Sequence, residues 1–266
     1  MKSLCLIRPF RRPEAKSSVA TALVIALASF ILVACTNGSS SPPSQSPSQL
    51  LASSTASAHA ANSLHYVATT SGPGGTVTIT GDVSRTGGTQ TIVAAVSGQT
   101  GHVTVTLVNA TAYFRGDEIG LAGFMGLPST VAQQYANHWI SLDSTNGAFA
   151  SVSAALTTSS ALSQITVPKP LSFGGTTQKM NQQVFTIGGT VTATPPGATK
   201  PVKVPVSLYV GTAKEHLPVY YTGTLTQNGK KQTQTIALSG WNEPLTTSAP
   251  VGSVPIGVLG SSPVEA

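Results

Sequence analysis

Carboxylates, histidines and cysteines are the side chains of this sequence that could catalyse a reaction or hold a metal ion. The chain has eight Asp and Glu residues, five histidines and two cysteines. The adjacent pair Asp117 and Glu118 is more typical of the first turn of a helix than of an acid–base dyad. Glu215-His216 lacks the second histidine of a zinc-binding helix, and no Gly-x-Ser-x-Gly turn is present. The sequence therefore predicts no catalytic residue, no metal site, no cofactor and no enzymatic activity.

Cys35 differs from these residues because it ends a segment that could direct its acylation. A mainly apolar run of sixteen residues, 19–34, follows a leader that contains five Lys and Arg residues. A transmembrane helix needs about 20 apolar residues, whereas the apolar region of a signal peptide has about 7–15. The run ends Leu32-Val33-Ala34-Cys35, which resembles a bacterial lipobox. We therefore predict residues 1–34 to be a lipoprotein signal peptide that is cleaved before Cys35, the lipidation site.

This prediction has two alternatives, an uncleaved single-span anchor and an ordinary signal peptide with a chance cysteine. The export route is open as well. Arg11-Arg12 fits twin-arginine export, but Pro13-Glu14 stands where an apolar pair is usual. A lipidated Cys35 predicts that the protein is anchored in the cell membrane on its extracytoplasmic side.

The chain from Cys35 onward carries few charges. It has nine basic and seven acidic residues, because five of the 14 Lys and Arg residues belong to the leader. No basic tract of the kind that follows a phosphate backbone remains, so we expect no nucleic-acid partner. Cys5 is lost with the leader and Cys35 is acylated, so no disulfide can form.

Residues 35–61 are rich in Ser, Pro, Ala and Thr, and Leu50-Leu51 are their main bulky apolar residues. Such a composition buries little apolar surface and does not offset the entropy of ordering the chain. We predict a flexible tether that, at about 5–6 Å times the square root of its length, spans about 25–30 Å.

The chain after residue 62 changes from strands to helices and back to strands. The segment 76–84 alternates with period two, with Val77, Ile79 and Val83 on one face. Helices are expected from Asp117 onward and at 128–135, 149–156 and 160–165, and Pro205 is expected at a sheet edge or bulge. This order predicts an α+β fold, a curved antiparallel half-barrel with short helices packed on its concave face. The expected strands are 64–67, 76–84, 90–97, 102–108, 111–115, 138–142, 184–187, 191–193, 204–210, 217–225 and 231–238.

The aliphatic face of the first strands and the apolar residues of the middle helices can be interpreted in two ways. They can bury one another as an ordinary core, or the helices can stand off from the sheet and leave a cavity wide enough for an acyl chain. Periodicity alone does not distinguish these arrangements.

A series of landmarks occurs in a fixed order along the chain. After the lipobox and the tether come Tyr113-Phe-Arg-Gly116, His138-Trp139-Ile140, His216-Leu-Pro218 and Ala237-Leu-Ser-Gly-Trp241. This order is similar to that of actinobacterial lipoproteins of the LppX/LprG type, and more distantly to the LolA/LolB fold. The resemblance covers residues 62–250, so the tail 251–266 is expected to be loose. It implies a U-shaped half-barrel whose hydrophobic cavity binds lipids or acylated glycolipids and helps to move them through the envelope.

We therefore expect a membrane-anchored lipoprotein that binds the acyl chains of a lipid or glycolipid in a hydrophobic cavity and carries them across the cell envelope. The alternative is a non-catalytic envelope lipoprotein with a structural role or a protein partner. The predicted cavity residues are Ile79, Val105, Leu107, Phe114, Leu121, Phe124, Met125, Phe149 and Leu162.

Overall fold

The computed structural model of the protein describes residues 45–194, 200–227 and 229–259. The predicted signal peptide, Cys35 and residues 36–44 of the predicted tether lie outside the described residues. The described residues all belong to one compact unit. Among the described residues, no helix is both long and apolar enough to cross a membrane.

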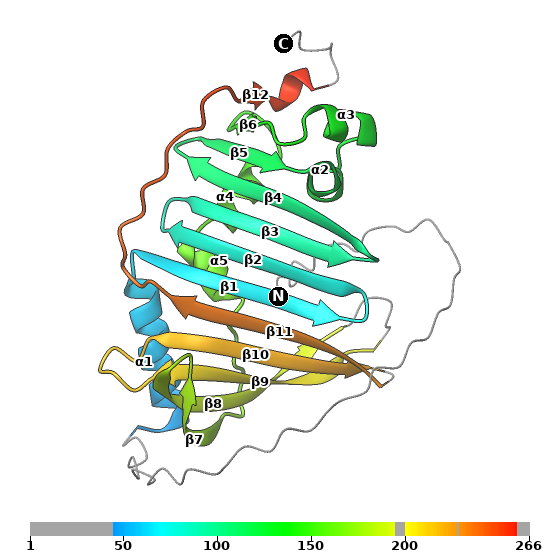
Figure 1. The fold of residues 1–266 in the computed structure, drawn as a ribbon. Helices are drawn as coiled ribbons and strands as arrows, with labels where there is room; N and C mark the ends of the chain where they lie inside the picture. The colour runs from blue at the N-terminus through cyan, green and yellow to red at the C-terminus, as the bar shows by residue number, and fades with distance from the viewer. Residues whose placement is uncertain (1–44, 195–199, 228, 260–266) are drawn as a thin grey trace, which may run out of the picture. The chain divides into compact units, whose positions relative to one another are not determined.

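One sheet organises this unit. Its twelve strands are ordered β12-β6-β5-β4-β3-β2-β1-β11-β10-β9-β8-β7 (Figure 1). The neighbouring strands are antiparallel, except for the short parallel pair of β12 and β6. The strands are β1 (Ser63–Gly72), β2 (Gly75–Ser84), β3 (Gly88–Val96), β4 (Gln99–Val108), β5 (Thr111–Gly116), β6 (Ile140–Asp143), β7 (Ser172–Lys179), β8 (Gln182–Ala193), β9 (Val202–Gly211), β10 (Pro218–Gln227), β11 (Lys230–Ser239) and β12 (Val254–Pro255).

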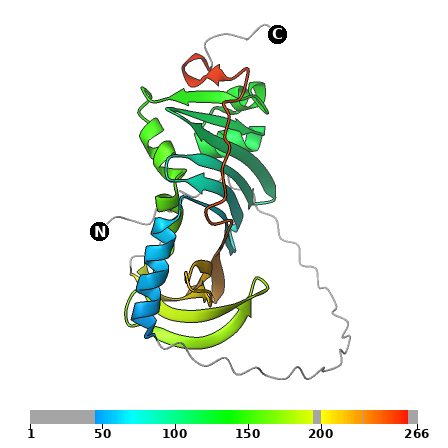
Figure 2. The same ribbon diagram turned by 90° about the vertical axis from the view of Figure 1, so that its left-hand side faces the viewer.

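The sheet is curved and does not close into a barrel (Figure 2). Its helices are short: α2 (Glu118–Met125), α3 (Ser129–Gln134), α4 (Phe149–Ala155) and α5 (Thr158–Ser163). A longer helix, α1 (Pro47–Ala60), lies on the same side of the sheet as α4 and α5 (Figures 1 and 2). The predicted α+β half-barrel with short helices is confirmed.

The two faces of the sheet differ because side chains alternate along each strand. Tyr66, Ile236 and Leu238 are buried on the concave side. The opposite face carries rows of threonines, in which the hydroxyl of Thr91 lies 3.2 Å from that of Thr104. Threonine suits this face because its branched side chain favours strands while its hydroxyl remains polar.

Buried apolar residues form two clusters, one at each end of the sheet. The first joins α1 and α5 to β1 and β8–β11, and the second joins α2, α3 and α4 to β4–β6. The two clusters share the concave side of one continuous sheet.

The prediction of a flexible tether is wrong for residues 47–60, which form α1. Ser46 begins this helix with a capping box, since its side chain accepts from the backbone N–H of Gln49 and the Gln49 side chain accepts from Ser46 N–H. Pro47 stands in the first turn, where its missing N–H costs nothing. Leu50, Ser54 and Ala58 recur every four residues and are buried, so α1 packs against the sheet with one narrow face.

The predicted loose tail is wrong for residues 254–258. Val254 and Pro255 form β12, which pairs with Ile140 and Ser141, and a 3₁₀ turn (Ile256–Val258) follows. β7 occupies the other edge of the sheet and is not among the strands expected from the sequence. Pro205 was expected at a sheet edge or a bulge, and it lies where β9 has a partner strand on one side. It pairs with Thr190 of β8, whereas the pairing of β9 with β10 ends at Val206.

The docking of α1 can be tested at Leu50, which has 0% of its surface exposed. We expect Leu50→Ala to lower the free energy of unfolding by about 2–5 kcal/mol, because it removes buried methyl groups and leaves a cavity. Thr55→Ala, on the exposed face of the same helix, should change it by less than about 0.5 kcal/mol. Urea denaturation measures both variants, and equal stabilities would show that α1 does not pack on the sheet.

Ser54 offers a second test of the same interface. Its hydroxyl is buried and has no hydrogen-bond partner among the described residues. Ser54→Ala should therefore raise the free energy of unfolding by about 1 kcal/mol, since it removes an unpaired buried hydroxyl and introduces a better helix former. A loss of stability in the same urea experiment would contradict the unpaired state of this hydroxyl.

Candidate functional site

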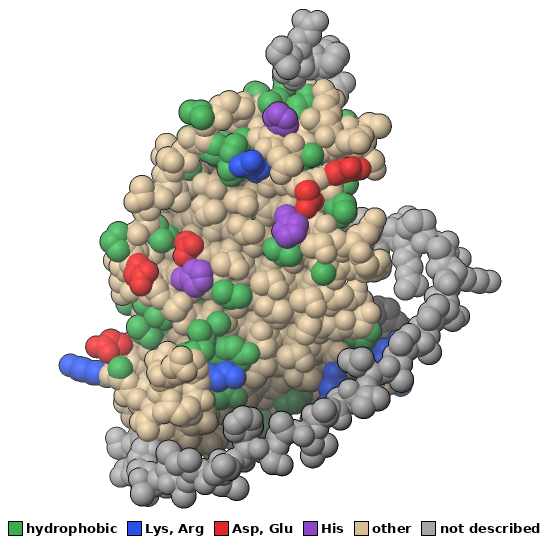
Figure 3. All heavy atoms as spheres, viewed as in Figure 1, with side chains coloured by type: hydrophobic (Ala, Val, Ile, Leu, Met, Phe, Trp, Pro, Cys, Tyr) green, Lys and Arg blue, Asp and Glu red, His purple; other side chains and the backbone are tan. Residues whose placement is uncertain are grey.

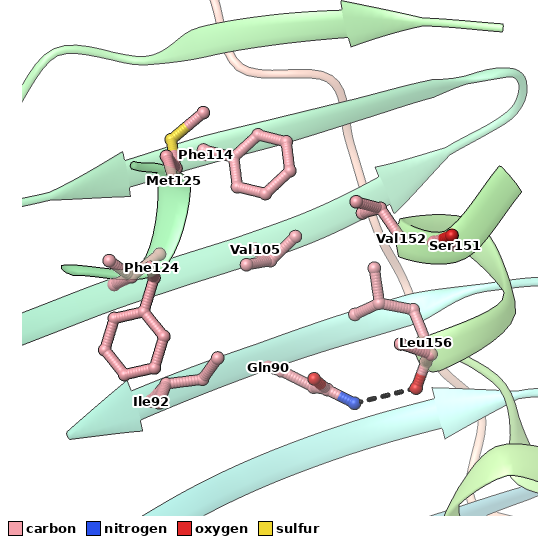
Figure 4. Close-up of a pocket in the computed structure, with 11 residues that line it drawn as sticks. Gln90, Ile92, Val105, Phe114, Phe124, Met125, Ser151, Val152 and Leu156 are labelled. Carbon is pink, nitrogen blue, oxygen red and sulfur yellow. Dashed lines mark hydrogen bonds between the residues drawn. The ribbon is translucent and has the colours of Figure 1, made fainter. Parts of the chain in front are cut away.

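An apolar pocket of about 250 Å³ lies on the concave side of β3, β4 and β5. The helices α2 and α4 border it from opposite sides (Figure 4). Nine of its eleven lining residues are apolar, and the two polar ones are Gln90 and Ser151. The lining consists of Gln90, Ile92, Val103, Val105, Phe114, Phe124, Met125, Ser151, Val152, Ala155 and Leu156.

The floor of the pocket follows from strand register. Gln90 of β3 pairs with Val105 of β4, which in turn pairs with Phe114 of β5. Ile92 and Val103 form the neighbouring pair two residues along. Paired residues of adjacent strands point to the same face, so these five side chains form one continuous patch.

The first wall is the end of α2, which carries Phe124 and Met125 (Figure 4). Asp117 fixes the start of this helix, because its carboxylate accepts from Gly120 N–H at 2.6 Å and from His102 N–H of β4 at 3.0 Å. A Cβ on Gly120 would lie only 2.2 Å from the carbonyl oxygen of His102. The helix therefore approaches β4 closely enough to place its last turn beside the floor.

The second wall is α4, which Gln90 ties to the sheet. The Gln90 Nε2 donates to the carbonyl oxygen of Ala155 at 3.0 Å and also to the hydroxyl of Tyr66. Because a carbonyl can only accept, this contact fixes which end of the amide faces α4. Burial raises the pKa of the Tyr66 phenol, so this hydroxyl stays protonated at neutral pH.

The structure brings together only part of the predicted cavity set. Val105, Phe114, Phe124 and Met125 line the pocket. The others do not line it: Leu107, Leu121 and Phe149 pack in the surrounding apolar cluster, and Ile79 and Leu162 belong to the other cluster. That any of these residues contacts a ligand stays a prediction.

Seven of the eleven lining residues are not among the predicted cavity residues. Ile92 and Val103 could have been found, since they alternate in phase with predicted strand residues. Gln90 could not, because its role depends on a contact with α4, 65 residues away in the chain. Ser151, Val152, Ala155 and Leu156 depend on which face α4 turns to the sheet.

Other groupings of polar side chains occur in the described part of the chain. Among the described residues, no group of three or more His, Cys, Asp or Glu side chains could hold a metal ion. The ion pair of His65 Nδ1 with Asp82, at 2.7 Å, lies on the outer face. A polar hollow of about 370 Å³ includes His102, Arg115 and Asp117, but Asp117 is already engaged in capping α2.

No protein-family model and no curated protein matches the chain. Among solved structures, it is similar to the Mycobacterium tuberculosis lipoprotein LppX, with 16% identity, coverage of 75% of this chain and 96% of that one, and a TM-score of 0.44. It is also similar to LprF from Mycobacterium bovis, with 17% identity, coverage of 80% of this chain and 100% of that one, and a TM-score of 0.49. A third similar structure is an uncharacterized conserved protein from Thermus thermophilus, with 10% identity, coverage of 80% of this chain and 99% of that one, and a TM-score of 0.36. LppX is one of the proteins whose landmark order the sequence resembles.

Tyr66 and Tyr221 predict how stability depends on pH. Burial raises both phenol pKa values above the 10.0 of a free tyrosine. Their contribution to stability is complete below pH 10 and is lost as the pH rises through the raised values, because the unfolded chain then ionises more readily. Above about pH 10 the free energy of unfolding should fall less steeply with pH in Tyr66→Phe and in Tyr221→Phe than in the unchanged protein. Chemical denaturation between pH 8 and 11 measures this slope, and identical slopes in all three proteins would contradict it.

Proposed function

We propose that this protein is a non-enzymatic lipoprotein that binds the acyl chains of a lipid or acylated glycolipid in the pocket between α2 and α4. Cys35 holds it at the extracytoplasmic side of the cell membrane, and the protein carries its ligand across the envelope. The observation that carries this proposal is the pocket itself, which combines nine apolar lining residues with no charged one.

The volume of the pocket limits what it can hold. An apolar cavity of about 150 Å³ accepts benzene, which has six carbons, so about 250 Å³ corresponds in proportion to roughly ten carbons. At about 0.8 kcal/mol for each buried methylene, such a segment contributes about 8 kcal/mol before the cost of association. Since that cost is about 4–15 kcal/mol, a longer acyl chain must gain further burial outside the pocket.

The concave face offers that further burial next to Ile92. Ile79 of β2 lies directly opposite Ile92 in the strand register, and Val77 lies opposite Ala94 two residues on. All four side chains are half-buried. An acyl chain that leaves the pocket past Ile92 would therefore cover Ile79, which gives this predicted residue a role beside the pocket rather than in its lining.

The position of α1 shortens the connection to the membrane. The helix begins at its cap, Ser46, so residues 36–45 replace the longer predicted tether. Ten residues span at most about 33–36 Å even when fully extended. The unit therefore works within one molecular diameter of the bilayer, where a lipid carrier has to load.

Mass spectrometry of organic extracts tests the proposal. The mature protein, purified from a host that processes lipoproteins, should contain a stoichiometric acyl lipid besides the diacylglyceryl group of Cys35. A protein whose extracts hold no such lipid, even after incubation with membrane lipids, would overturn the proposal.

A matched pair of variants on α4 locates the ligand. Both alanines are exposed, but Ala155 lines the pocket and Ala154 does not. Ala155→Trp should therefore fill the pocket, whereas Ala154→Trp places the same side chain outside the lining. Displacing even three methylenes costs about 2.4 kcal/mol, or roughly fifty-fold in Kd. Lipid binding should therefore weaken by that factor in Ala155→Trp and stay unchanged in Ala154→Trp. Equal binding by the two variants would place the ligand elsewhere.

A further inference from the structure

The charged residues of the unit are divided between its two ends. Residues 165–239, which include β7–β11, contain seven lysines but one acidic residue, Glu215. Residues 45–164, which include β1–β6, contain two arginines and four acidic residues. On the face shown in Figure 3, Lys and Arg side chains lie mainly over the lower part, whereas Asp and Glu side chains lie mainly over the upper and middle parts, with one beside a basic side chain at the lower left. We call residues 165–239 the lysine half; its lysines are Lys169, Lys179, Lys200, Lys203, Lys214, Lys230 and Lys231.

These lysines are accessible and their charge is not neutralised locally. Six of the seven are exposed. Lys179 is the half-buried one, and its ammonium group stands 4.0 Å from the ring centre of Tyr220. In the part of the chain that the structure describes, the one ion pair is His65–Asp82, which involves no lysine. The lysine half therefore presents its positive field directly to the solvent.

The chain enters the unit at this same end. The first turn of α1 lies beside β7 and β8, and the helix then runs toward the start of β1 (Figures 1 and 2). Leu50, near the start of α1, packs in the apolar cluster of β8–β11. The residues that connect to Cys35 therefore leave from the lysine half and not from the acidic end.

We propose that the lysine half is a membrane-facing surface that binds anionic phospholipid headgroups and orients the anchored protein. The orienting role rests on the proposed lipid anchor at Cys35. A membrane surface rich in anionic lipid attracts lysines within a Debye length, about 8–10 Å at physiological salt. It repels the acidic end, so both ends of the unit favour the same orientation.

The distribution of the lysines fits an extended surface better than a small anion. Lys214 lies in the loop between β9 and β10, whereas Lys230 and Lys231 begin β11 at the opposite end of the strands. Lys179 ends β7 at the sheet edge. Charges at both ends of the strands cannot converge on one phosphate group, but they can all lie near one plane of headgroups.

A pair of labelling sites measures the orientation. Ala213, beside Lys214, and Ala110, in the turn between β4 and β5, are both exposed alanines in turns. Since the thiol of Cys35 is acylated in the mature protein, Ala213→Cys or Ala110→Cys supplies the one thiol for a fluorescent label. Each labelled lipoprotein is reconstituted into vesicles, and energy transfer to a bilayer dye is compared between the two sites. Vesicles of phosphatidylglycerol and phosphatidylcholine are compared with vesicles of phosphatidylcholine alone.

The short connection to Cys35 can by itself bring position 213 closer to the bilayer than position 110, and phosphatidylcholine vesicles measure that effect. The expected result is a larger excess of transfer from position 213 in the anionic vesicles than in phosphatidylcholine. This additional excess should disappear at about 1 M salt, where the Debye length is about 3 Å. An excess that is the same in both kinds of vesicle, or that salt does not reduce, would overturn the proposal.

Two charge variants distinguish an effect of the lysine half itself from an effect of the overall net charge. Lys230→Gln with Lys231→Gln removes two charges from the lysine half. It should lower the ratio of molecules with the lysine half toward the bilayer to those with the opposite orientation roughly thirtyfold. Gln133→Glu with Gln134→Glu alters the net charge equally on exposed residues of α3 and should leave the preference intact. An equal loss in both variants would contradict a local surface. If salt removes the protein from the vesicles altogether, the anchor at Cys35 is wrong, whereas the lysine half as the lipid-binding surface is supported.

Discussion

The pairing of β1 with β11 is the interaction on which the rest of the structure depends. It joins residues 65–71 to residues 233–239 and so merges two separate meanders into one curved sheet. Such a contact between distant parts of the chain carries a large entropy cost of loop closure. Further bonds secure this point: Ser63 Oγ donates to the Glu243 carbonyl at 2.6 Å, and Asn242 N–H donates to the Ser63 carbonyl at 3.0 Å. Without this pairing there is no common concave face.

The pocket exists because short helices cover this concave face incompletely. Each helix is held at the sheet by a specific polar contact, α2 through Asp117 and α4 through Gln90. These polar contacts fix the positions of the two helices on the sheet. The helices therefore do not move together and close the space between them. The sheet face continues past the pocket at Ile79 and Val77, which are half-buried. The same incomplete cover leaves the apolar surface that the proposed acyl ligand would use.

Alternation of apolar and polar residues made most of this fold predictable. The strand around Val77 and Ile79 and the helix after Asp117 were found from local pattern alone. In contrast, the sequence did not predict α1, because its buried face includes Ser54 and Ala58 and is hardly more hydrophobic than its exposed face. The capping box of Ser46 and Gln49 is the signal that could have indicated this helix. β7 has no apolar alternation and forms as an edge partner of β8. For the pocket, the sequence could identify the apolar face, but which residues remain uncovered depends on contacts such as that of Gln90 with Ala155.

The two proposals together define the route that a lipid would have to take. The first turn of α1 and the lysine half lie at the β7 end of the sheet, whereas the pocket lies over β3–β5. If the lysine half faces the bilayer, an acyl chain reaches the pocket only by moving across β1 and β2 along the concave face. Ile79 stands on that path, directly before Ile92 of the pocket. Val77 and Ile79 of β2 are half-buried, whereas Leu64, Tyr66 and Ala68 of β1 are buried in the cluster of α1 and α5. An acyl chain crossing β1 would therefore have to displace side chains packed there before it reached Ile79.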